Sequence, residues 1–395
     1  MSRFLVVAPY VPHPVRHGGA IRSRVLLDAL QGDHELHLAV AVADEADAAN
    51  ARALACELDA EVHTLPASQT TRSRFAGKLG AWLTGRSELA KRRWRPDARS
   101  AFDRLCVHLG EPRGLVDSTW SLPVVARRRW PLFLHNLEYS LFARADGKGR
   151  PFAERISRAC EARALRRLER AAIARAPVTV TVSEHDRNLA LALCPAARVE
   201  VVPNSVDLSR LPLLPAADAN APPRLLFVGS LDYPPNLEAV TELVERHLPA
   251  LRAAFPELVV RLVGKDPAGL GVRFRGVPGV ELVGPVDDVV EHYRTAHAVF
   301  LPIRSGGGTR IKILEAWALG VPVVATRVAA EGLPADDGVH LLRFETPGEG
   351  VEAVRRVLAG GGEALRQNGR ALVEQRFSHA AAIEQLSALF REAVS

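Results

Sequence analysis

The sequence predicts an α/β protein built from two doubly wound, Rossmann-like domains that face a cleft. Short apolar runs alternate with amphipathic stretches along the chain, which is typical of parallel sheets covered by helices on both faces. The alternation stops once, in the Pro-, Ala- and Asp-rich stretch 204–223, and then restarts. A chain of 395 residues is also too long for one ordinary core and suits two domains.

The first domain is expected over residues 1–203. Apolar runs such as RFLVVA and ELHLAVAV predict strands at 3–8, 35–42, 61–65, 114–117, 131–135, 178–182 and 199–202. Amphipathic spacing predicts helices at 20–31, 45–57, 98–109, 152–175 and 184–193. Strands and helices thus alternate as a parallel sheet with crossover helices requires.

The second domain is expected over residues 224–377, after a linker at 204–223. Its strands are predicted at 224–228, 258–263, 280–283, 298–301, 321–325 and 338–342. Its helices are predicted at 236–254, 286–296, 309–319, 347–359 and 362–376. A last helix, within 378–395, is free to pack back on the first domain. Ligands of such sheets bind outside the carboxyl ends of the strands, so residues at strand ends are the candidates for a site.

Composition weighs against several other classes of protein. The net charge of +6 is modest and aromatic residues make up only 6% of the chain, so no nucleic-acid partner is expected. The four cysteines lack metal-ligand or redox spacing and no Asp-x-Asp triplet stands at a strand end, so no metal is expected. No apolar run is long enough for a membrane span or a signal peptide, and the expected location is the cytoplasm.

Two strand ends of the first domain carry residues that can bind a polar substrate. Gly18 and Gly19 precede a helix, where glycine lets an anion approach backbone N–H groups; a plain turn is the alternative. His135, Asn136 and Glu138 follow the run PLFL, where an imidazole can accept a proton or bind a hydroxyl near pH 7. A structural histidine is the competing interpretation of His135.

Glycines also recur at the strand ends of the second domain. Gly229-Ser230 follows the run RLLFV, and Gly264-Lys265 follows LVVRLV. Each pair alone is a weak signal, because glycine is common in loops. Their recurrence favours a surface at which backbone approaches a ligand closely.

The helix predicted at 309–319 begins with cations in its first turn, where they oppose the helix dipole. Each such cation costs on the order of 0.3–1 kcal/mol. Unless these cations are merely solvated, we therefore expect an anion to lie beside them. The residues of this expected site are Gly307, Gly308, Thr309 as the N-cap, Arg310 and Lys312.

The stretch 71–95 is both cationic and amphipathic. Phe75, Leu79, Trp82 and Leu83 share one side of a predicted helix that cations flank. This pattern resembles an interfacial membrane helix, and a helix that covers the acceptor site is the alternative. Trp82 is accordingly an acceptor-side candidate, and peripheral contact with the inner face of the membrane stays open.

With these parts assembled, the chain resembles the family-4 retaining glycosyltransferases of the GT-B fold over nearly its whole length. The most specific part is GGGTRIKILEAWALGVPVVATRVAAEGL at 306–333, which is similar to that family's donor-site helix. Supporting parts are Gly18-Gly19, HNLEYS, FVGSLDYPPN and the closing RFSHAAAIEQL. The resemblance is strongest to bacterial sugar transferases of surface-polysaccharide or natural-product synthesis.

The resemblance implies roles for single residues. Glu315 would match the second acid of the family's E-x7-E motif, which holds the ribose hydroxyls. Gly18 and Gly19 would contact the diphosphate or the acceptor, and His135 would lie near the reacting sugar. Val286 would lie against the base through its backbone.

Two departures from the family pattern concern the donor. Gly307 stands where the first acid of E-x7-E is expected. Ser230 and Asn236 stand where the family has an Arg and a Lys. Arg310 and Lys312 would restore this positive charge from the other side of the diphosphate.

The expected function is transfer of a hexose from a nucleoside-diphosphate sugar, UDP- or GDP-linked, to an acceptor hydroxyl. The resemblance implies retention of configuration, no metal or other cofactor, and a role in polysaccharide, glycolipid or glycosylated natural-product synthesis, with a lipid-linked acceptor as one option. A nucleotide-sugar epimerase stays open as an alternative and would need an acid/base pair of carboxylates. A degenerate partner subunit is the other alternative, for which Gly307 is the best argument. The sequence does not determine the oligomeric state.

Overall fold

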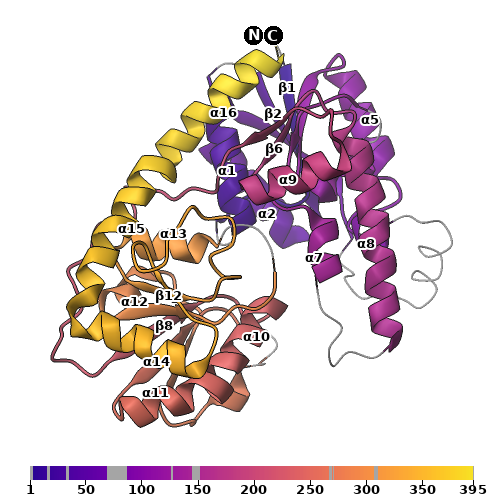
Figure 1. Cartoon of the computed structure of the whole chain (residues 1–395). Coiled ribbons are helices and arrows are strands. Elements are labelled where there is room, and N and C mark those ends of the chain that lie inside the picture. The colour runs from indigo at the N-terminus through magenta and orange to yellow at the C-terminus, as the bar shows by residue number, and fades with distance from the viewer. Residues whose placement is uncertain are drawn as a thin grey trace. The chain divides into compact units, whose positions relative to one another are not determined.

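The computed structural model describes residues 3–15, 18–32, 35–68, 87–125, 128–144, 152–266, 269, 271–306 and 310–394. The chain forms two compact units (Figure 1). The first comprises Met1–Asn204 with Ala382–Ser395, and the second comprises Ser205–Ala381. The last helix, α16 (His379–Val394), therefore begins in the second unit and continues into the first.

A seven-stranded parallel sheet lies at the centre of the first unit. Its strand order is β3-β2-β1-β4-β5-β6-β7, so the chain builds outward from β1 and then returns to add β4 on the other side. This reversal between β1 and β4 is the switch point at which doubly wound sheets bind ligands. The strands are β1 (Arg3–Ala8), β2 (Glu35–Val42), β3 (Ala60–Pro66), β4 (Arg113–Asp117), β5 (Leu132–Phe133), β6 (Thr179–Thr181) and β7 (Val199–Val201).

Helices cover both faces of this sheet. They are α1 (Gly18–Leu30), α2 (Glu45–Glu57), α4 (Glu88–Arg92), α5 (Ala98–His108), α6 (Leu122–Val125), α7 (Glu138–Arg144), α8 (Phe152–Ile173) and α9 (Glu184–Leu193). Successive side chains of a strand point to opposite faces. Val6 packs with α1, α2 and α16, whereas Val7 packs with α5, α6, α8 and α9. Phe390 of α16 is buried in the former core, and Ser387 Oγ donates a hydrogen bond to the carbonyl of Ala29 at 2.7 Å.

The second unit repeats the design with six parallel strands. Their order is β10-β9-β8-β11-β12-β13, which places the switch point between β8 and β11. The strands are β8 (Arg224–Val228), β9 (Val259–Val263), β10 (Val280–Gly284), β11 (Ala298–Leu301), β12 (Val323–Ala325) and β13 (Leu342–Arg343). The helices are α10 (Pro234–Glu242), α11 (Leu248–Ala254), α12 (Val290–Arg294), α13 (Ile311–Ala318), α14 (Pro347–Arg356) and α15 (Gly362–Arg376).

The stretch 204–223 is expected to be a linker, but from Ser205 onward it belongs to the second unit. Leu214 is buried in that unit's core, and its N–H donates to the carbonyl of Leu319 at 3.1 Å. Arg366 donates to the carbonyl of Leu214 at 2.9 Å. Part of the predicted linker is therefore packed against the second unit through Leu214, although its proline-rich composition predicted no packing.

The two parallel sheets confirm the predicted α/β class and its doubly wound units. One predicted strand, 338–342, is wrong: β13 covers only Leu342–Arg343, because Gly338 has φ +76° and turns the chain. The helix predicted at 236–254 is interrupted by a π-helical turn at Leu243–His247. The helix predicted at 309–319 is shorter, Ile311–Ala318.

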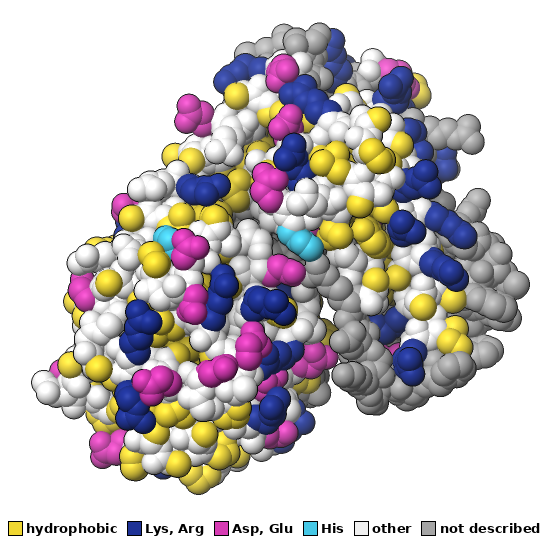
Figure 2. All heavy atoms as spheres, in the orientation of Figure 1, with side chains coloured by type: hydrophobic (Ala, Val, Ile, Leu, Met, Phe, Trp, Pro, Cys, Tyr) yellow, Lys and Arg dark blue, Asp and Glu magenta, His cyan; other side chains and the backbone are white. Residues whose placement is uncertain are grey.

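The surface and the helices carry two further observations. On the face of the second unit that Figure 2 shows, Lys and Arg side chains are interspersed with Asp and Glu, so no single-signed field covers that face. Among the helices that the structure describes, none combines the length and the apolar character that a membrane crossing needs.

Candidate functional site

The carboxyl ends of β8 and β9 in the second unit approach so closely that the residues following them, Gly229 and Gly264, have no room for side chains. Gly264 has φ +151°, and a Cβ on it would lie 2.1 Å from the carbonyl oxygen of Gly229. A Cβ on Gly229 would lie 2.7 Å from Asn236 Nδ2 and 2.9 Å from Lys312 Nζ. Both glycines, predicted as site residues, are therefore required by the close approach of the loops that follow β8 and β9.

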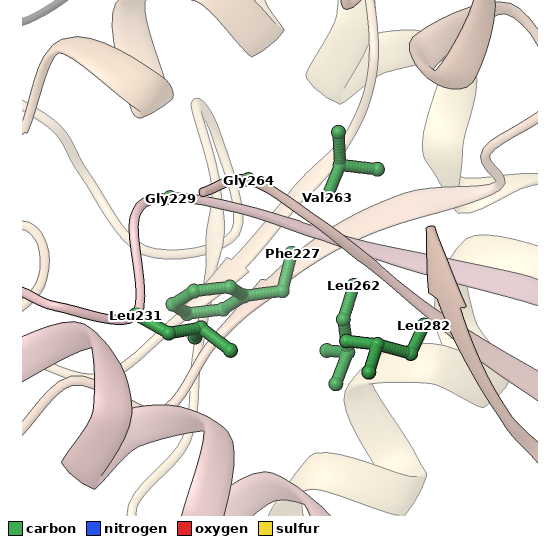
Figure 3. Close-up of a pocket in the computed structure, with 7 residues that line it drawn as sticks. All are labelled: Phe227, Gly229, Leu231, Leu262, Val263, Gly264 and Leu282. Atoms are coloured by element: carbon green, nitrogen blue, oxygen red, sulfur yellow. The ribbon is translucent and has the colours of Figure 1, made fainter. Parts of the chain in front are cut away.

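A small pocket lies beside this crossing (Figure 3). Phe227 and Leu231 lie on one side of it, and Leu262 and Leu282 on the other, with the two glycines above. Its walls are apolar side chains and glycine backbone, so the polar groups of the site come from elsewhere.

Lys312 brings a cation to this place from α13. Its Nζ donates to Asn236 Oδ1 at 2.9 Å and lies 4.4 Å from the centroid of the Phe227 ring. Burial, followed by the nearby Arg310 guanidinium, lowers the pKa of Lys312 to about 7, against the attraction of Glu315. An anion bound beside this half-buried amine would stabilise its protonated form and would therefore raise the pKa of Lys312 again.

Arg310 lies at the N-cap position of α13, which corrects its expected place in the first turn. Its Nη2 donates to the carbonyl of Ser305 at 3.1 Å. Gly306 has φ +100°, and a Cβ on it would lie 3.0 Å from Arg310 Nη2. Arg310 therefore holds the loop before the helix as well as placing charge there. The remaining residues of the expected motif, Gly307, Gly308 and Thr309, lie outside the described residues.

Glu315 lies one turn further along α13. The hydroxyl of Tyr293 approaches its Oε2 at 3.5 Å, a long contact that leaves the carboxylate oxygens with capacity to accept more hydrogen bonds. Burial raises the pKa of Glu315, and the ammonium of Lys312 opposes this rise.

The other predicted donor residues lie in neighbouring loops. Ser230 Oγ contacts the Asp232 carboxylate and the carbonyl of Lys265, the latter at 3.3 Å. The side chain of Lys265 itself is exposed. Val286 follows β10 and packs partly against the core of the unit. Among the predicted donor residues, Gly229 and Lys312 therefore lie next to each other. Lys265 contacts Ser230 only through its backbone carbonyl.

In the first unit, His135 belongs to a hydrogen-bond network at the switch point. The buried Asp117 accepts from His135 Nε2 at 2.6 Å and from Ser23 Oγ at 2.5 Å. The Tyr10 hydroxyl lies 3.1 Å from Ser23 Oγ and 3.4 Å from His135 Nδ1. Tyr10 has one proton for these two acceptors, and the shorter contact favours Ser23. His135 Nδ1 then remains an acceptor that a substrate hydroxyl can use.

Helix α1 supplies a second part of this network. It begins at Gly18 with Gly19 next, and it carries Arg22 and Ser23 one turn later. Arg22 is buried, donates to the carbonyl of Val202 at 2.9 Å, and stacks 4.1 Å from the centroid of the Phe133 ring. Burial lowers the pKa of Arg22 to about 9, against the attraction of nearby carboxylates.

Glu138, the first residue of α7, is a buried carboxyl group. Burial raises its pKa to about 7, against hydrogen bonds from Asn136 and Trp120. Glu169 is fully buried and accepts the backbone N–H groups of Glu138 at 2.8 Å and of Tyr139 at 3.1 Å. Burial also raises the pKa of Glu169, to about 8. Because Glu169 accepts the first backbone N–H groups of α7, we interpret it as a structural cap of this helix. Trp82 lies outside the described residues.

Several residues of the first-unit network were missed by sequence reasoning. Two of them had a signal: Asp117 ends the strand GLVD and Tyr10 follows the strand RFLVVA. The other three lie inside predicted helices, and only their burial in the fold identifies them: Arg22, Ser23 and Glu169.

A comparison with family models matches residues 222–360 to the glycosyl transferases group 1. These residues make up most of the second unit and include the glycine crossing, Lys312 and Glu315. No curated protein matches the chain.

Solved structures match both units together. Sucrose-phosphate synthase from Thermosynechococcus elongatus has a TM-score of 0.73 at 20% identity, with 100% of each chain covered. Anabaena HepE, in complex with UDP-glucose, has a TM-score of 0.63 at 15% identity, covering 99% of this chain and 100% of its own. The lipopolysaccharide outer core galactosyltransferase WaaB has a TM-score of 0.60 at 13% identity, covering 100% and 99%. These likenesses show the GT-B fold.

Proposed function

Because residues 222–360 match the family model of the glycosyl transferases group 1, we propose that the chain transfers a hexose from a nucleoside-diphosphate sugar to an acceptor hydroxyl with retention of configuration. The nucleotide sugar is assigned to the second unit and the acceptor to the first. UDP is the favoured nucleotide, because HepE of the same fold is solved with UDP-glucose. A glycolipid or polysaccharide acceptor is favoured by the name of WaaB, a lipopolysaccharide transferase.

One observation carries this proposal: Lys312 Nζ lies beside glycine backbone at the switch point of the family-matched unit. Backbone without side chains gives the oxygens of a diphosphate close access, and the ammonium supplies an opposite charge. A diphosphate would also reverse the fall in the pKa of Lys312, so binding would take up a proton at this amine and would weaken as the pH rises above 7.

The proposed reaction breaks the bond between the anomeric carbon and the diphosphate oxygen, and forms one between that carbon and the acceptor oxygen. The leaving phosphate takes the acceptor's proton on the same face of the sugar. Lys312 and Arg310 stabilise the charge that develops on the diphosphate. Glu315 accepts from the ribose hydroxyls, and His135 Nδ1 accepts a hydrogen bond from a sugar hydroxyl.

The Asp117–His135 pair favours one alternative mechanism. A carboxylate behind an imidazole is also the arrangement of a general base, which would take the acceptor's proton from the opposite face and invert the configuration. The configuration of the product decides between the two mechanisms.

The proposal is tested by incubating the purified protein with a panel of UDP- and GDP-hexoses, without acceptor. We expect one nucleoside diphosphate to bind, and slow release of that diphosphate from its sugar. Accumulation of an epimeric nucleotide sugar would identify an epimerase instead. Binding of neither UDP nor GDP at millimolar concentration would favour a non-catalytic partner subunit.

A further inference from the structure

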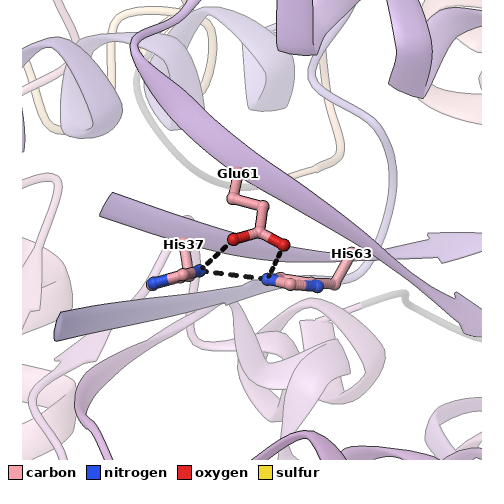
Figure 4. A group of neighbouring side chains, drawn as sticks. All are labelled: His37, Glu61 and His63. Atoms are coloured by element: carbon pink, nitrogen blue, oxygen red, sulfur yellow. Dashed lines mark hydrogen bonds and ion pairs between the residues drawn. The ribbon is translucent and has the colours of Figure 1, made fainter. Parts of the chain in front are cut away.

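A cluster of metal-binding side chains lies in the first unit, near the amino ends of two strands. His37 is on β2, and Glu61 and His63 are on the edge strand β3 (Figure 4). The parallel register pairs His37 with Glu61 and Ala39 with His63, so the three side chains share one face of the sheet. The residues assigned to substrate lie at the carboxyl ends of strands, so this cluster is separate from them.

The donor atoms of the cluster have the spacing of zinc ligands. His37 Nδ1 lies 3.1 Å from His63 Nε2 and 3.4 Å from Glu61 Oε2, and Glu61 Oε1 lies 3.8 Å from His63 Nε2. Ligands bound tetrahedrally to zinc at about 2.0–2.2 Å lie about 3.3–3.6 Å from one another. The three groups can therefore form one face of a zinc tetrahedron after small side-chain rotations.

The surroundings of His37 provide an independent observation. The residue is 1% exposed, and its Nε2 is buried without a hydrogen bond. Glu35 Oε1 lies 3.4 Å from this Nε2, and Arg3 Nε holds the same carboxylate at 3.3 Å. Histidines that bind metals usually direct their second ring nitrogen to a carboxylate. With Nδ1 on an ion, the His37 proton is held on Nε2, where the Glu35 carboxylate is the acceptor within reach.

Without an ion, the short distance between the two rings requires a shared proton. One imidazole must then donate an N–H to the other. When His37 Nδ1 is the donor, His37 Nε2 carries no proton and faces the Glu35 carboxylate without a hydrogen bond. An ion on Nδ1 excludes this unfavourable tautomer.

We propose that His37 Nδ1, His63 Nε2 and the Glu61 carboxylate bind one zinc ion, with water in the fourth position. The ion ties the edge strand β3 to β2 and has a structural role. Sequence spacing predicted no metal site, because these residues come together only through the strand register. The transfer reaction proposed above does not use this ion.

The test uses untagged protein stripped with EDTA and dialysed, into which zinc is titrated in competition with a chromophoric chelator. We expect one tight site per chain and a higher Tm with zinc. His63→Gln, at the less buried histidine, should weaken zinc binding at least 100-fold and abolish the Tm increase. His108→Gln, which alters a nearby histidine outside the cluster, should preserve both.

Two results would overturn the proposal. One is a wild-type protein that binds no zinc at about 10 µM free metal, a concentration well above the Kd of structural zinc sites. The other is a His63→Gln protein that is folded by circular dichroism and binds zinc as tightly as wild type. Glu61→Gln, at an exposed side chain that cannot unfold the core, is the second variant and should also weaken binding.

Discussion

The Nζ of Lys312, on α13, lies 2.9 Å from Oδ1 of Asn236, on α10. The family resemblance places a lysine where this chain has Asn236. Lys312 therefore delivers an ammonium from α13 to the neighbourhood of that position. Asn236 thus holds the Lys312 ammonium beside the backbone of Gly229.

The first prediction concerns pH. The pKa of Lys312 in the free protein is lowered to about 7, so the amine loses its proton above pH 7, and a bound diphosphate raises the pKa again. Binding then takes up a proton, and affinity for UDP should fall between pH 7 and pH 9 by up to tenfold per unit. Calorimetry in buffers of different ionisation enthalpy measures this uptake. Lys312→Met provides the matched baseline, and an equal slope in both proteins would contradict the assignment.

The second prediction concerns Glu315. Glu315→Gln should weaken UDP binding by about 1.5–3 kcal/mol, because an amide accepts from two ribose hydroxyls less well than a carboxylate does. Inorganic pyrophosphate has no ribose, so its affinity should change little. Equal losses for UDP and pyrophosphate would mean that Glu315 acts only through Lys312. Tyr293→Phe removes the existing partner of Glu315 and should leave UDP binding within threefold of wild type.

The third prediction concerns His135. His135→Gln should lower kcat about tenfold or more, because the substrate hydroxyl loses an imidazole acceptor, while the product keeps the anomeric configuration of the donor sugar. Proton NMR of the product gives the anomeric coupling. An inverted anomer from the wild-type enzyme would instead assign the Asp117–His135 pair as general base.

The fourth prediction concerns the glycine crossing. Gly264→Ala should destabilise the protein by about 2 kcal/mol or more, because its Cβ would collide with the carbonyl oxygen of Gly229 at a positive φ. Gly348 is a matched control, since a Cβ there meets nothing within 4 Å. Urea denaturation should find Gly348→Ala at least as stable as wild type. Similar stability of both variants would show that the crossing relaxes easily.

Much of the fold was predictable because the central strands are fully buried and read as continuous apolar runs. The bounds of β1, β2, β8 and β11 agree with the prediction for this reason. Short helices such as α6 and α7 were not predicted, because one or two turns carry too little periodicity. The packing of Leu214 could not be predicted, because the proline-rich sequence around it has no helical or strand periodicity.

Candidate site residues could be identified from the sequence only at or just after strand ends. Gly229 and Gly264 follow β8 and β9 directly and His135 comes two residues after β5, whereas Asp117, the last residue of β4, was missed. The Lys312–Asn236 contact joins two helices and cannot be inferred from spacing. The same is true of His37 and His63, which meet through strand register alone.

The central claim is tested most directly by the affinity of Lys312→Met for UDP, measured by isothermal titration calorimetry at pH 6.5, where the wild-type amine is mostly charged. The account predicts a loss of tenfold or more, as expected for a charged hydrogen bond of about 1.5–3 kcal/mol, with a variant at least as stable as wild type. Arg355→Met removes an exposed positive charge from α14 and should bind UDP normally. Wild-type UDP affinity in a folded Lys312→Met protein would contradict the account.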